Sequence, residues 1–309
     1  MALEKNRKLW YTEKNLKKGG VSVEVLNVTA VNVGEGMKIR DYLKFRLGFS
    51  SSLIGKVKYG GVTLNGSVVH MRATVHEGDA IAVRYPEENS ENVEPMAIPL
   101  AVLYEDEAIL VVDKPTDMPI HPSRGNHLPT LANAVSHYMG GSFVFRAITR
   151  LDRDTSGVVL IAKNQLAAAN LGREITKGAM EKRYHARVTG IPEPREGEIF
   201  APIAREREDS LRRVVREDGK DSLTRYRVLS VDGEGNALCE VMPITGRTHQ
   251  IRVHMAHIGH PLKDDFLYGE QNEGKIYFLR CVSLTFTHPF SGECMTVTVE
   301  KNERSLSDF

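Results

Sequence analysis

The sequence predicts an α+β protein in two parts. A small α/β unit comes first, followed by a larger domain with a mixed, largely antiparallel sheet and flanking helices. Helical and alternating patterns succeed one another across residues 37–85, an acidic stretch follows, and the strand-like runs beyond it are separated by too few helices for a doubly wound parallel sheet. The 309 residues, 41% of them apolar, are enough for one large core and one small core.

The small unit is expected to contain a helix and a hairpin. Its first apolar residues have helical spacing, namely Ile39, Tyr42, Leu43 and Leu47. The Asn65-Gly66 pair between alternating apolar residues predicts a tight hairpin turn, and a last strand is expected from Ala80 to Val83. We therefore expect an N-terminal extension at 1–35 and a domain at 36–85.

Charge divides the chain at about the same place. The formal net charge is +1, but residues 1–85 contain 14 Lys and Arg against 7 Asp and Glu, a net of +7, so residues 86–309 carry −6. A basic module on an acidic body favours contact with a phosphate backbone. A solvated basic surface would give the same count.

The larger domain is expected at 97–309, after an acidic linker at 86–96. Two helices are predicted, one from Leu131 to Tyr138 after Thr130 and one from Leu166 to Ile175 that ends before Gly178. Strands are predicted at Ile109–Val112, Val158–Ala162, Tyr184–Val188, Leu223–Val231, Leu238–Met242 and Met295–Val299.

The cellular setting follows from the cysteines and the N-terminus. Cys239, Cys281 and Cys294 form no C-x-x-C pair, so neither a disulfide framework nor a cysteine zinc site is indicated. The lysine-rich start lacks the apolar core of a signal peptide, and no apolar run approaches the ~20 residues of a membrane span. We expect a monomer in the cytoplasm, without a membrane partner.

The strongest chemical signal is the run R-L-D-R-D-T-S-G at residues 150–157, which leads into an apolar strand. Two carboxylates and two guanidinium groups in one short loop allow one carboxylate to be held ionised and directed into a cleft. In an arbitrary loop, the same residue types more often make turns and caps. An aspartic protease is excluded because Ser156 interrupts the D-T-G triplet and no second copy supplies the partner carboxylate.

The whole pattern resembles the RluA family of RNA pseudouridine synthases. Besides R-L-D-x-x-T-S-G, three further segments match in order: I-L-V-V-D-K-P at 109–115, K-R-Y-H-A at 182–186 and G-R-T-H-Q-I-R-V-H at 246–254. The small unit resembles the S4 RNA-binding domain, through V-T-L-N-G at 62–66 and G-D-A-I-A-V at 78–83. The order of these segments makes the resemblance far more specific than any one of them.

The resemblance implies roles for particular residues. Asp152 would be the catalytic carboxylate, Arg252 its guanidinium partner, and Tyr184 the aromatic that covers the uracil face. RNA contacts are expected from Arg150, Arg247, His249, Gln250, Lys114 and Lys182, although His249 and Gln250 would also suit hydrogen bonds to backbone. The target uridine would be turned out of its helix, in ribosomal or transfer RNA. No cofactor is expected, because the reaction needs no redox change, group donor or energy input.

Two other classes compete with this interpretation. A non-catalytic RNA-binding protein that kept the fold would be expected to lose the carboxylate, and a hydrolase of the same glycosidic bond would release free uracil. A metal site is also conceivable, given the histidines at 249, 254, 257 and 260. However, His254 and His257 supply only two ligands on one helical face, without a carboxylate at a characteristic spacing. We therefore expect no metal.

Overall fold

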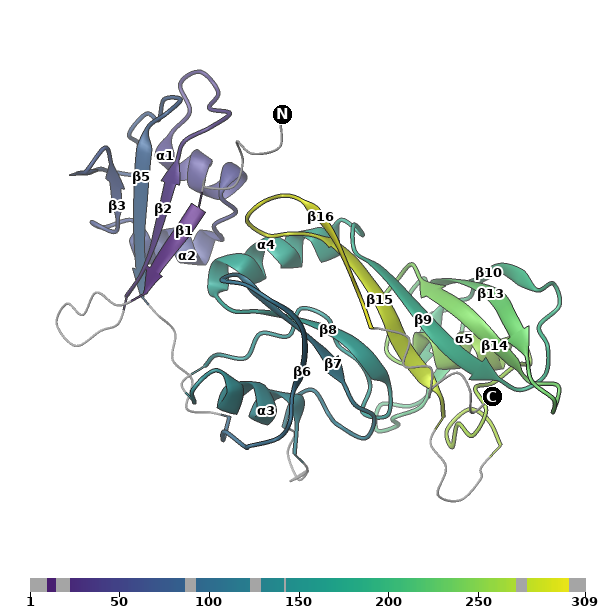
Figure 1. Cartoon of the computed structure of the whole chain (residues 1–309). Helices are drawn as coiled ribbons and strands as arrows, with labels where there is room; N and C mark the ends of the chain where they lie inside the picture. The colour runs from purple at the N-terminus through teal and green to yellow at the C-terminus, as the bar shows by residue number, and fades with distance from the viewer. Residues whose placement is uncertain are drawn as a thin grey trace, which may run out of the picture.

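The computed structural model describes residues 10–14, 23–86, 93–122, 129–141, 143–270 and 277–299. They form two bodies, each with its own sheet, which lie one above the other in Figure 1. The buried apolar residues fall into two clusters, one in each body. No helix among these residues is long and apolar enough to cross a membrane.

The first body contains a five-stranded sheet in the order β1-β2-β5-β3-β4. Its strands are β1 (Trp10–Lys14), β2 (Val23–Thr29), β3 (Val62–Leu64), β4 (Ser67–Val68) and β5 (Ala80–Pro86). Its helical segments are α1 (Ile39–Asp41), the π-helical turn η1 (Tyr42–Arg46) and α2 (Ser51–Val57). Asn65 and Gly66 both have positive φ, which confirms the expected hairpin turn.

The first body starts earlier in the chain than its motifs indicated. Strand β2 pairs with β5 along its whole length and contributes Leu26 to the core, and β1 pairs with β2. The expected boundary at residue 36 is therefore too late, because strands of the expected extension complete the sheet. The expected linker lies partly outside the described residues.

The second body is built on a nine-stranded sheet, and every strand pair in it is antiparallel except β15 with β8. This arrangement confirms the predicted mixed, largely antiparallel sheet. Along the sheet the strands are β10 (Glu196–Phe200), β13 (Leu223–Val231), β14 (Ala237–Pro243), β9 (Glu181–Val188), β15 (Leu279–Thr287), β8 (Ser156–Ala162), β7 (Ile109–Lys114) and β6 (Ala101–Glu105). Beside it, β16 (Cys294–Thr298) pairs with β15, and β11 (Ile203–Arg205) pairs with β12 (Arg213–Val215).

Three helices cover this sheet. Both predicted helices are confirmed, as α3 (Leu131–Tyr138), which Thr130 caps with a capping box, and α4 (Gln165–Thr176), whose N-cap is Asn164. Helix α5 (Gln250–His257) packs against β12, β13 and β14. Its first turn follows His249, which has φ 56°, so the chain turns sharply before the helix begins.

Helix α4 also joins the two bodies. Leu166, at its start, is buried in the core of the first body. Asn170 and Arg173 donate side-chain hydrogen bonds to the carbonyls of Leu47 and Lys44, at 3.5 and 3.2 Å. Gly48, at φ 80°, lies so close to these two side chains that a Cβ atom there would overlap them. The first body is thus docked on α4 through polar and apolar contacts.

Candidate active site

Strand β8, which follows the loop at residues 150–155, anchors this loop to the core. Leu151 is buried under the loop, and strand β8 then continues through the core beside β7. A turn hydrogen bond from the Thr155 N–H to the Asp152 carbonyl, 3.2 Å, closes the loop. These contacts fix the backbone while leaving the Asp152 side chain one-third exposed.

Lys114 ties this loop to the neighbouring one. Its ammonium group is completely buried and donates to the carbonyls of Pro115, Met118 and Arg153, at 2.8, 2.8 and 2.9 Å. Burial lowers the pKa of Lys114 to about 8, against the opposing charges of Asp154 and Asp152. The predicted RNA contact of Lys114 is contradicted, since its three donors are all used inside the protein.

The two carboxylates of the loop have different surroundings. Asp154 is only 8% exposed and accepts a hydrogen bond from the Arg153 guanidinium at 2.9 Å. The only ion-pair contact of Asp152 within the described residues is with His249, whose Nε2 lies 3.8 Å from Oδ2. Asp152 is therefore the carboxylate of this loop that an incoming substrate can reach.

His249 is held by an aromatic neighbour. Its Nδ1 lies 2.9 Å from the hydroxyl of Tyr268, and the two rings meet edge to face with centroids 5.8 Å apart. Burial lowers the pKa of His249, the nearby Asp152 opposes this effect, and Arg252 adds to it. His249 is therefore neutral at pH 7, and its ring faces the carboxylate of Asp152.

Arg252 has a different partner from the one expected. Its Nε and Nη2 donate to Asp265 at 2.7 and 2.6 Å, a two-pronged pair in which both side chains are buried. No ion pair joins it to Asp152 among the described residues, so the predicted direct pairing is wrong for this structure. The guanidinium also lies over the ring of Tyr277, 4.4 Å from its centroid, and over that of Tyr268 at 5.0 Å.

Tyr184 lies on the inward face of β9, opposite Cys281 of β15. Burial raises the pKa of Tyr184 well above its ordinary value, and the charge of Asp152 contributes, so the phenol keeps its proton. Lys182, on the same strand, has a lowered pKa because of burial. Arg150, at the start of the loop at 150–155, is exposed.

The two remaining residues predicted to bind RNA differ in exposure. Arg247 is exposed, and its guanidinium donates to the Asp221 carbonyl at 3.1 and 3.0 Å. Gln250 is buried, and both ends of its amide are used inside the protein, by Thr245, Arg247, Leu223 and Thr224. The backbone alternative therefore holds for Gln250, and its predicted RNA contact is contradicted.

Two of the four histidines at 249–260, one in α5 and one after it, bond to groups of the protein itself. His254 is buried, with Nδ1 2.9 Å from the Thr224 hydroxyl and Nε2 2.9 Å from the Ala201 carbonyl. His260 lies 2.9 Å from the Thr189 carbonyl. No group of three His, Cys, Asp or Glu side chains in the described part of the chain could hold a metal ion.

Asp265 and Tyr268 were missed in the sequence although they belong to the site. Asp265 accepts the backbone N–H groups of Leu267 and Tyr268 in addition to Arg252, so it folds the turn that carries Tyr268. The signal was the run D-D-F-L-Y-G at 264–269, in which charged, aromatic and glycine residues follow one another outside any strand or helix.

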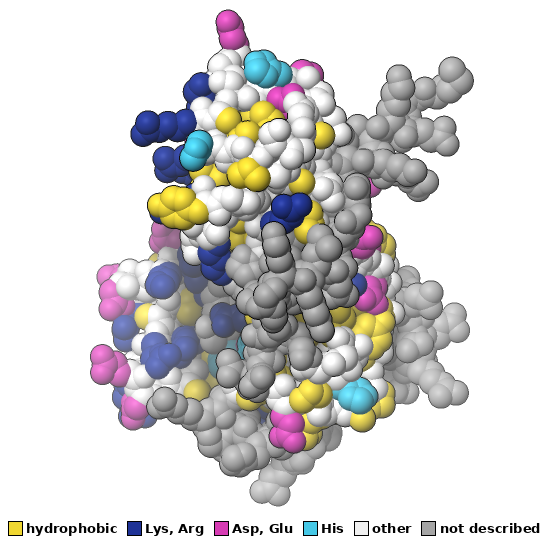
Figure 2. Space-filling model, turned by 90° about the vertical axis from the view of Figure 1, so that its left-hand side faces the viewer, with side chains coloured by type: hydrophobic (Ala, Val, Ile, Leu, Met, Phe, Trp, Pro, Cys, Tyr) yellow, Lys and Arg dark blue, Asp and Glu magenta, His cyan; other side chains and the backbone are white. Residues whose placement is uncertain are grey.

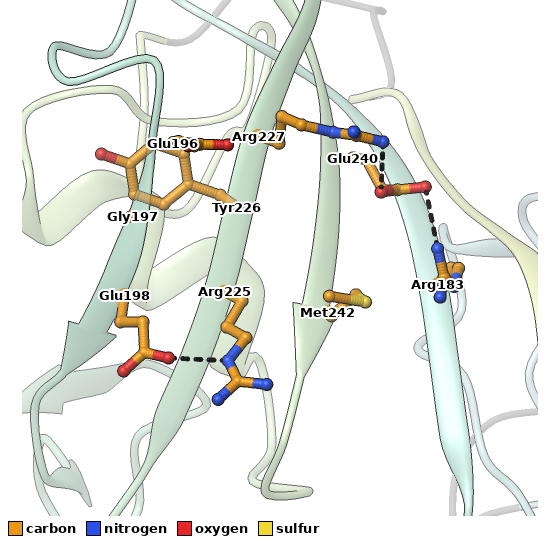
Figure 3. A pocket seen from close by; sticks show the side chains of 9 residues that line it. All are labelled: Arg183, Glu196, Gly197, Glu198, Arg225, Tyr226, Arg227, Glu240 and Met242. Carbon is orange, nitrogen blue, oxygen red and sulfur yellow. Dashed lines mark hydrogen bonds and ion pairs between the residues drawn. The ribbon is translucent and has the colours of Figure 1, made fainter.

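A groove of about 560 Å³ lies on the other face of the sheet and shares no residue with this site. Thr224 of β13 bonds to α5, so by strand alternation Arg225 and Arg227 face away from it. Figure 3 shows their guanidinium groups meeting carboxylates, Arg225 with Glu198 and Arg227 with Glu240. Because these arginines are already paired, the groove is not a ready anion site.

Comparison with known proteins agrees with the order of the motifs. A family model for RNA pseudouridylate synthase matches residues 108–257, the part that contains Asp152, Tyr184 and Arg252. The uncharacterized RNA pseudouridine synthase YjbO of Bacillus subtilis is 37% identical, over 84% of this chain and 93% of its own. The chain belongs to the RNA pseudouridine synthase family. It is an enzyme, an isomerase that converts uridine in RNA to pseudouridine.

Two further comparisons describe the range of this family. The ribosomal large subunit pseudouridine synthase D of Xanthomonas campestris is 37% identical, over 79% of each chain. The solved structure of human RNA pseudouridylate synthase domain containing 1 matches with a TM-score of 0.58 and 28% identity, over 68% of this pseudouridine synthase and 86% of that chain. The catalytic fold of the second body is thus shared with a protein of known structure.

Proposed function

We propose that Asp152 is the catalytic carboxylate of this pseudouridine synthase and acts on a uridine turned out of its RNA. The observation that carries this proposal is the contrast between three carboxylates near one another. Asp154 and Asp265 are buried and paired with arginines, whereas Asp152 is one-third exposed. A group that attacks a substrate must be reachable, and a group that only holds the fold need not be.

The reaction breaks the bond between N1 of uracil and C1′ of ribose and forms a bond from C5 to C1′. The C5 proton is then lost and N1 gains a proton, so atoms balance without a co-reactant. Asp152 would act either as nucleophile at C1′ or as the base that opens a glycal route. The phenol of Tyr184 would cover the uracil and, because it already carries a proton, could take part in the transfer of the C5 proton only as a relay that gives up one proton as it takes the other.

The exposed cations near the loop are proposed to hold the RNA. Arg150 and Arg247 are both exposed, and Lys182 is a half-buried cation whose pKa is lowered mainly by burial and also by the charge of Arg150. A base turned out of a helix leaves a gap and a distorted backbone, and guanidinium groups suit both the gap and its phosphates. His249 is proposed to act at the carboxylate and to contact the flipped nucleotide.

The first body is proposed to be an S4-like RNA-binding domain, formed by residues 23–86. Two of its aromatic side chains are strongly exposed, Phe45 at 67% and Tyr59 at 86%. The ammonium group of the preceding lysine, Lys44 or Lys58, lies over each ring. Aromatic faces next to cations suit stacked bases of unpaired RNA. In Figure 2, dark blue Lys and Arg side chains gather along the left edge of this body and recur below it on the second body.

Large-subunit ribosomal RNA is the substrate we propose first, and transfer RNA is the alternative. The support is the similarity to a relative named for the ribosomal large subunit. The test is to map pseudouridines in ribosomal and transfer RNA from cells with and without the gene. A position missing from transfer RNA alone would overturn the ribosomal assignment.

We further propose that the enzyme acts as a monomer in the cytoplasm, where its three unpaired thiols are stable.

The role of Asp152 is tested by two matched variants. Asp152→Asn keeps the volume of the side chain and loses its charge, so release of tritium from RNA carrying 5-tritiated uridine should fall by at least a thousandfold with RNA affinity unchanged. Asp154→Asn is the control, and it should lower thermal stability while keeping much of the activity. Activity retained in Asp152→Asn and lost in Asp154→Asn would reverse the assignment. Release of free uracil would indicate a hydrolase.

A further inference from the structure

The hydroxyl of Tyr268 connects the β11–β12 strand pair to the active site. It accepts a hydrogen bond from the backbone N–H of Arg213, the first residue of β12, at 2.9 Å, and lies 2.9 Å from Nδ1 of His249. On its other side, the His249 ring places Nε2 3.8 Å from the carboxylate of Asp152. The Arg213 N–H, the Tyr268 hydroxyl and the His249 ring, which come from separate segments, therefore form a chain of polar contacts that leads to Asp152.

One arrangement of the protons uses every donor among these three groups. An amide N–H can only donate, so the Tyr268 oxygen is the acceptor toward Arg213. The phenol has a single proton, and Nδ1 of His249 is its only hydrogen-bond acceptor among the described residues, so the arrangement that uses this proton makes Nδ1 the acceptor. Burial raises the pKa of Tyr268, so the phenol keeps this proton at neutral pH. A neutral imidazole that accepts at Nδ1 carries its own proton on Nε2, the atom that faces Asp152.

We propose that Tyr268 is a positioning residue that fixes His249 as the Nε2–H tautomer and so aims a hydrogen-bond donor at Asp152. The inference rests on the proposed role of Asp152. The spacing of 3.8 Å is longer than a hydrogen bond, and such contacts tighten when a substrate fills the site. A neutral donor holds the carboxylate in place without the full charge that would weaken it as a nucleophile.

The charges around His249 agree with a neutral ring. Asp152 and Asp265 favour its protonation, while Arg252 and Arg213 oppose it, and burial is the largest effect and lowers its pKa. The only hydroxyl that contacts the ring among the described residues is that of Tyr268. If His249 were protonated, Nδ1 would become a donor to the Tyr268 oxygen, and the phenol proton would lose its acceptor.

The tautomer can be read directly by nitrogen NMR of the full-length protein labelled with ¹⁵N-histidine. At pH 7.5 the wild type should show a protonated Nε2 and an unprotonated Nδ1 for His249, assigned by loss of its signal in His249→Asn. Tyr268→Phe should shift His249 toward a mixture of tautomers. Tyr226→Phe is the matched control, since its hydroxyl bonds only to the Pro194 carbonyl, at 3.0 Å, and it should leave the spectrum unchanged. A wild-type spectrum with the proton on Nδ1 would overturn the proposal without any variant.

Kinetics supply the second readout. Tyr268→Phe keeps the ring that lies against Arg252 and loses one hydrogen bond, so kcat should fall about tenfold with KM for RNA unchanged. His249→Asn suits the positive φ at this position and keeps an acceptor near Tyr268, but it lacks the atom that faces Asp152. Adding Tyr268→Phe to His249→Asn should therefore change kcat little. If the kcat losses of the two single variants multiplied in the double variant, Tyr268 would act on kcat independently of His249.

These results separate the present inference from the proposed function. The NMR spectrum does not depend on turnover, so it tests the tautomer even if Asp152 is not the catalytic group. If Asp152→Asn stayed active while the predicted tautomer was found, the catalytic assignment would fail and the assignment of the tautomer would stand. An unchanged kcat in Tyr268→Phe, with an unchanged spectrum, would contradict the positioning role alone.

Discussion

Residues in the site have divided tasks that their types do not reveal. Asp152, Asp154 and Asp265 are chemically identical, but two are buried and paired with guanidinium groups, whereas Asp152 is one-third exposed. The guanidinium of Arg252 is surrounded by the rings of Phe266, Tyr268 and Tyr277. Its pair with Asp265 therefore holds the turn at 265–269 against α5, which places Tyr268 beside His249.

Asp265→Asn is expected to destabilise the fold strongly. The amide keeps one acceptor but points an NH₂ group at the buried guanidinium of Arg252, leaving a charge without its partner. Breaking a buried pair in this way costs about 3–5 kcal/mol. Urea unfolding of the variant measures this loss. Glu198→Gln, in the exposed pair with Arg225, is the control and should cost less than about 1 kcal/mol. Equal losses of unfolding free energy in the two variants would mean that burial does not increase the contribution of the Arg252–Asp265 pair to stability.

The sequence predicted the residues of the site better than their partners. The resemblance to the family's four ordered motifs was enough to propose Asp152, Tyr184 and Arg252. The partner of Arg252 was not predictable, because Asp265 lies beyond the end of α5 in a turn whose geometry depends on tertiary contacts. Lys114 and Gln250 were misjudged for the same reason. A polar side chain in a motif can serve the substrate or the backbone, and only its burial decides between them.

At the scale of elements, one aspartate joins three segments of the catalytic body. Asp106, in the turn between β6 and β7, accepts the N–H groups of Ala108 and Ile109 at 2.7 and 2.9 Å. Its other oxygen lies 2.9 Å from the His288 ring, which follows β15, and 3.0 Å from the Tyr104 hydroxyl. This carboxylate therefore fixes the β6–β7 turn and joins it to the end of β15.

Asp106→Asn should cost stability in a way that depends on pH. Burial opposes ionisation, but the bonds from His288 and from the Ile109 and Ala108 N–H groups outweigh it and lower the pKa of Asp106 to about 2. Because the folded pKa lies below the unfolded value, the charged form stabilises the fold above about pH 4, and this contribution is lost as pH falls toward 2. We expect a loss of up to about 2 kcal/mol at pH 7, and a smaller difference at pH 3. Urea unfolding at both pH values measures it, and a difference independent of pH would contradict the assignment.

Strands with regular alternation were predictable, and irregular or short ones were not. Strand β15 was missed because a bulge between Cys281 and Ser283 shifts its inward face from odd to even positions. Strands β11 and β12 are three residues long and charged, so their sequences have no period to detect. The predicted boundaries of both helices were nearly correct, because Thr130 marked the start of α3 and the apolar pattern from Leu166 to Ile175 lies inside α4.

For the whole molecule, the fixed contact between the two bodies matters most. Gly48 fits against α4 only because it lacks a side chain, and Asn170 and Arg173 bond to the backbone beside it. RNA bound on the first body would therefore be presented to Asp152 at a set distance and angle. If the first body binds RNA as proposed, this arrangement would contribute to affinity and to the choice of uridine, and would leave the chemical step to the second body.

The full-length double variant Phe45→Ser with Tyr59→Ser tests this division of tasks. Each aromatic lies exposed beside a lysine, and stacking with a base contributes about 1–3 kcal/mol to binding. KM for RNA should therefore rise tenfold or more, while kcat at saturating RNA stays near the wild-type value, because neither side chain belongs to the catalytic body. Phe200→Ser removes an equally exposed aromatic, 69% exposed on β10, and should leave both constants unchanged. An unchanged KM in the double variant would remove the RNA-binding role of these aromatics, whereas a lower kcat with normal KM would mean that the first body shapes the catalytic site itself.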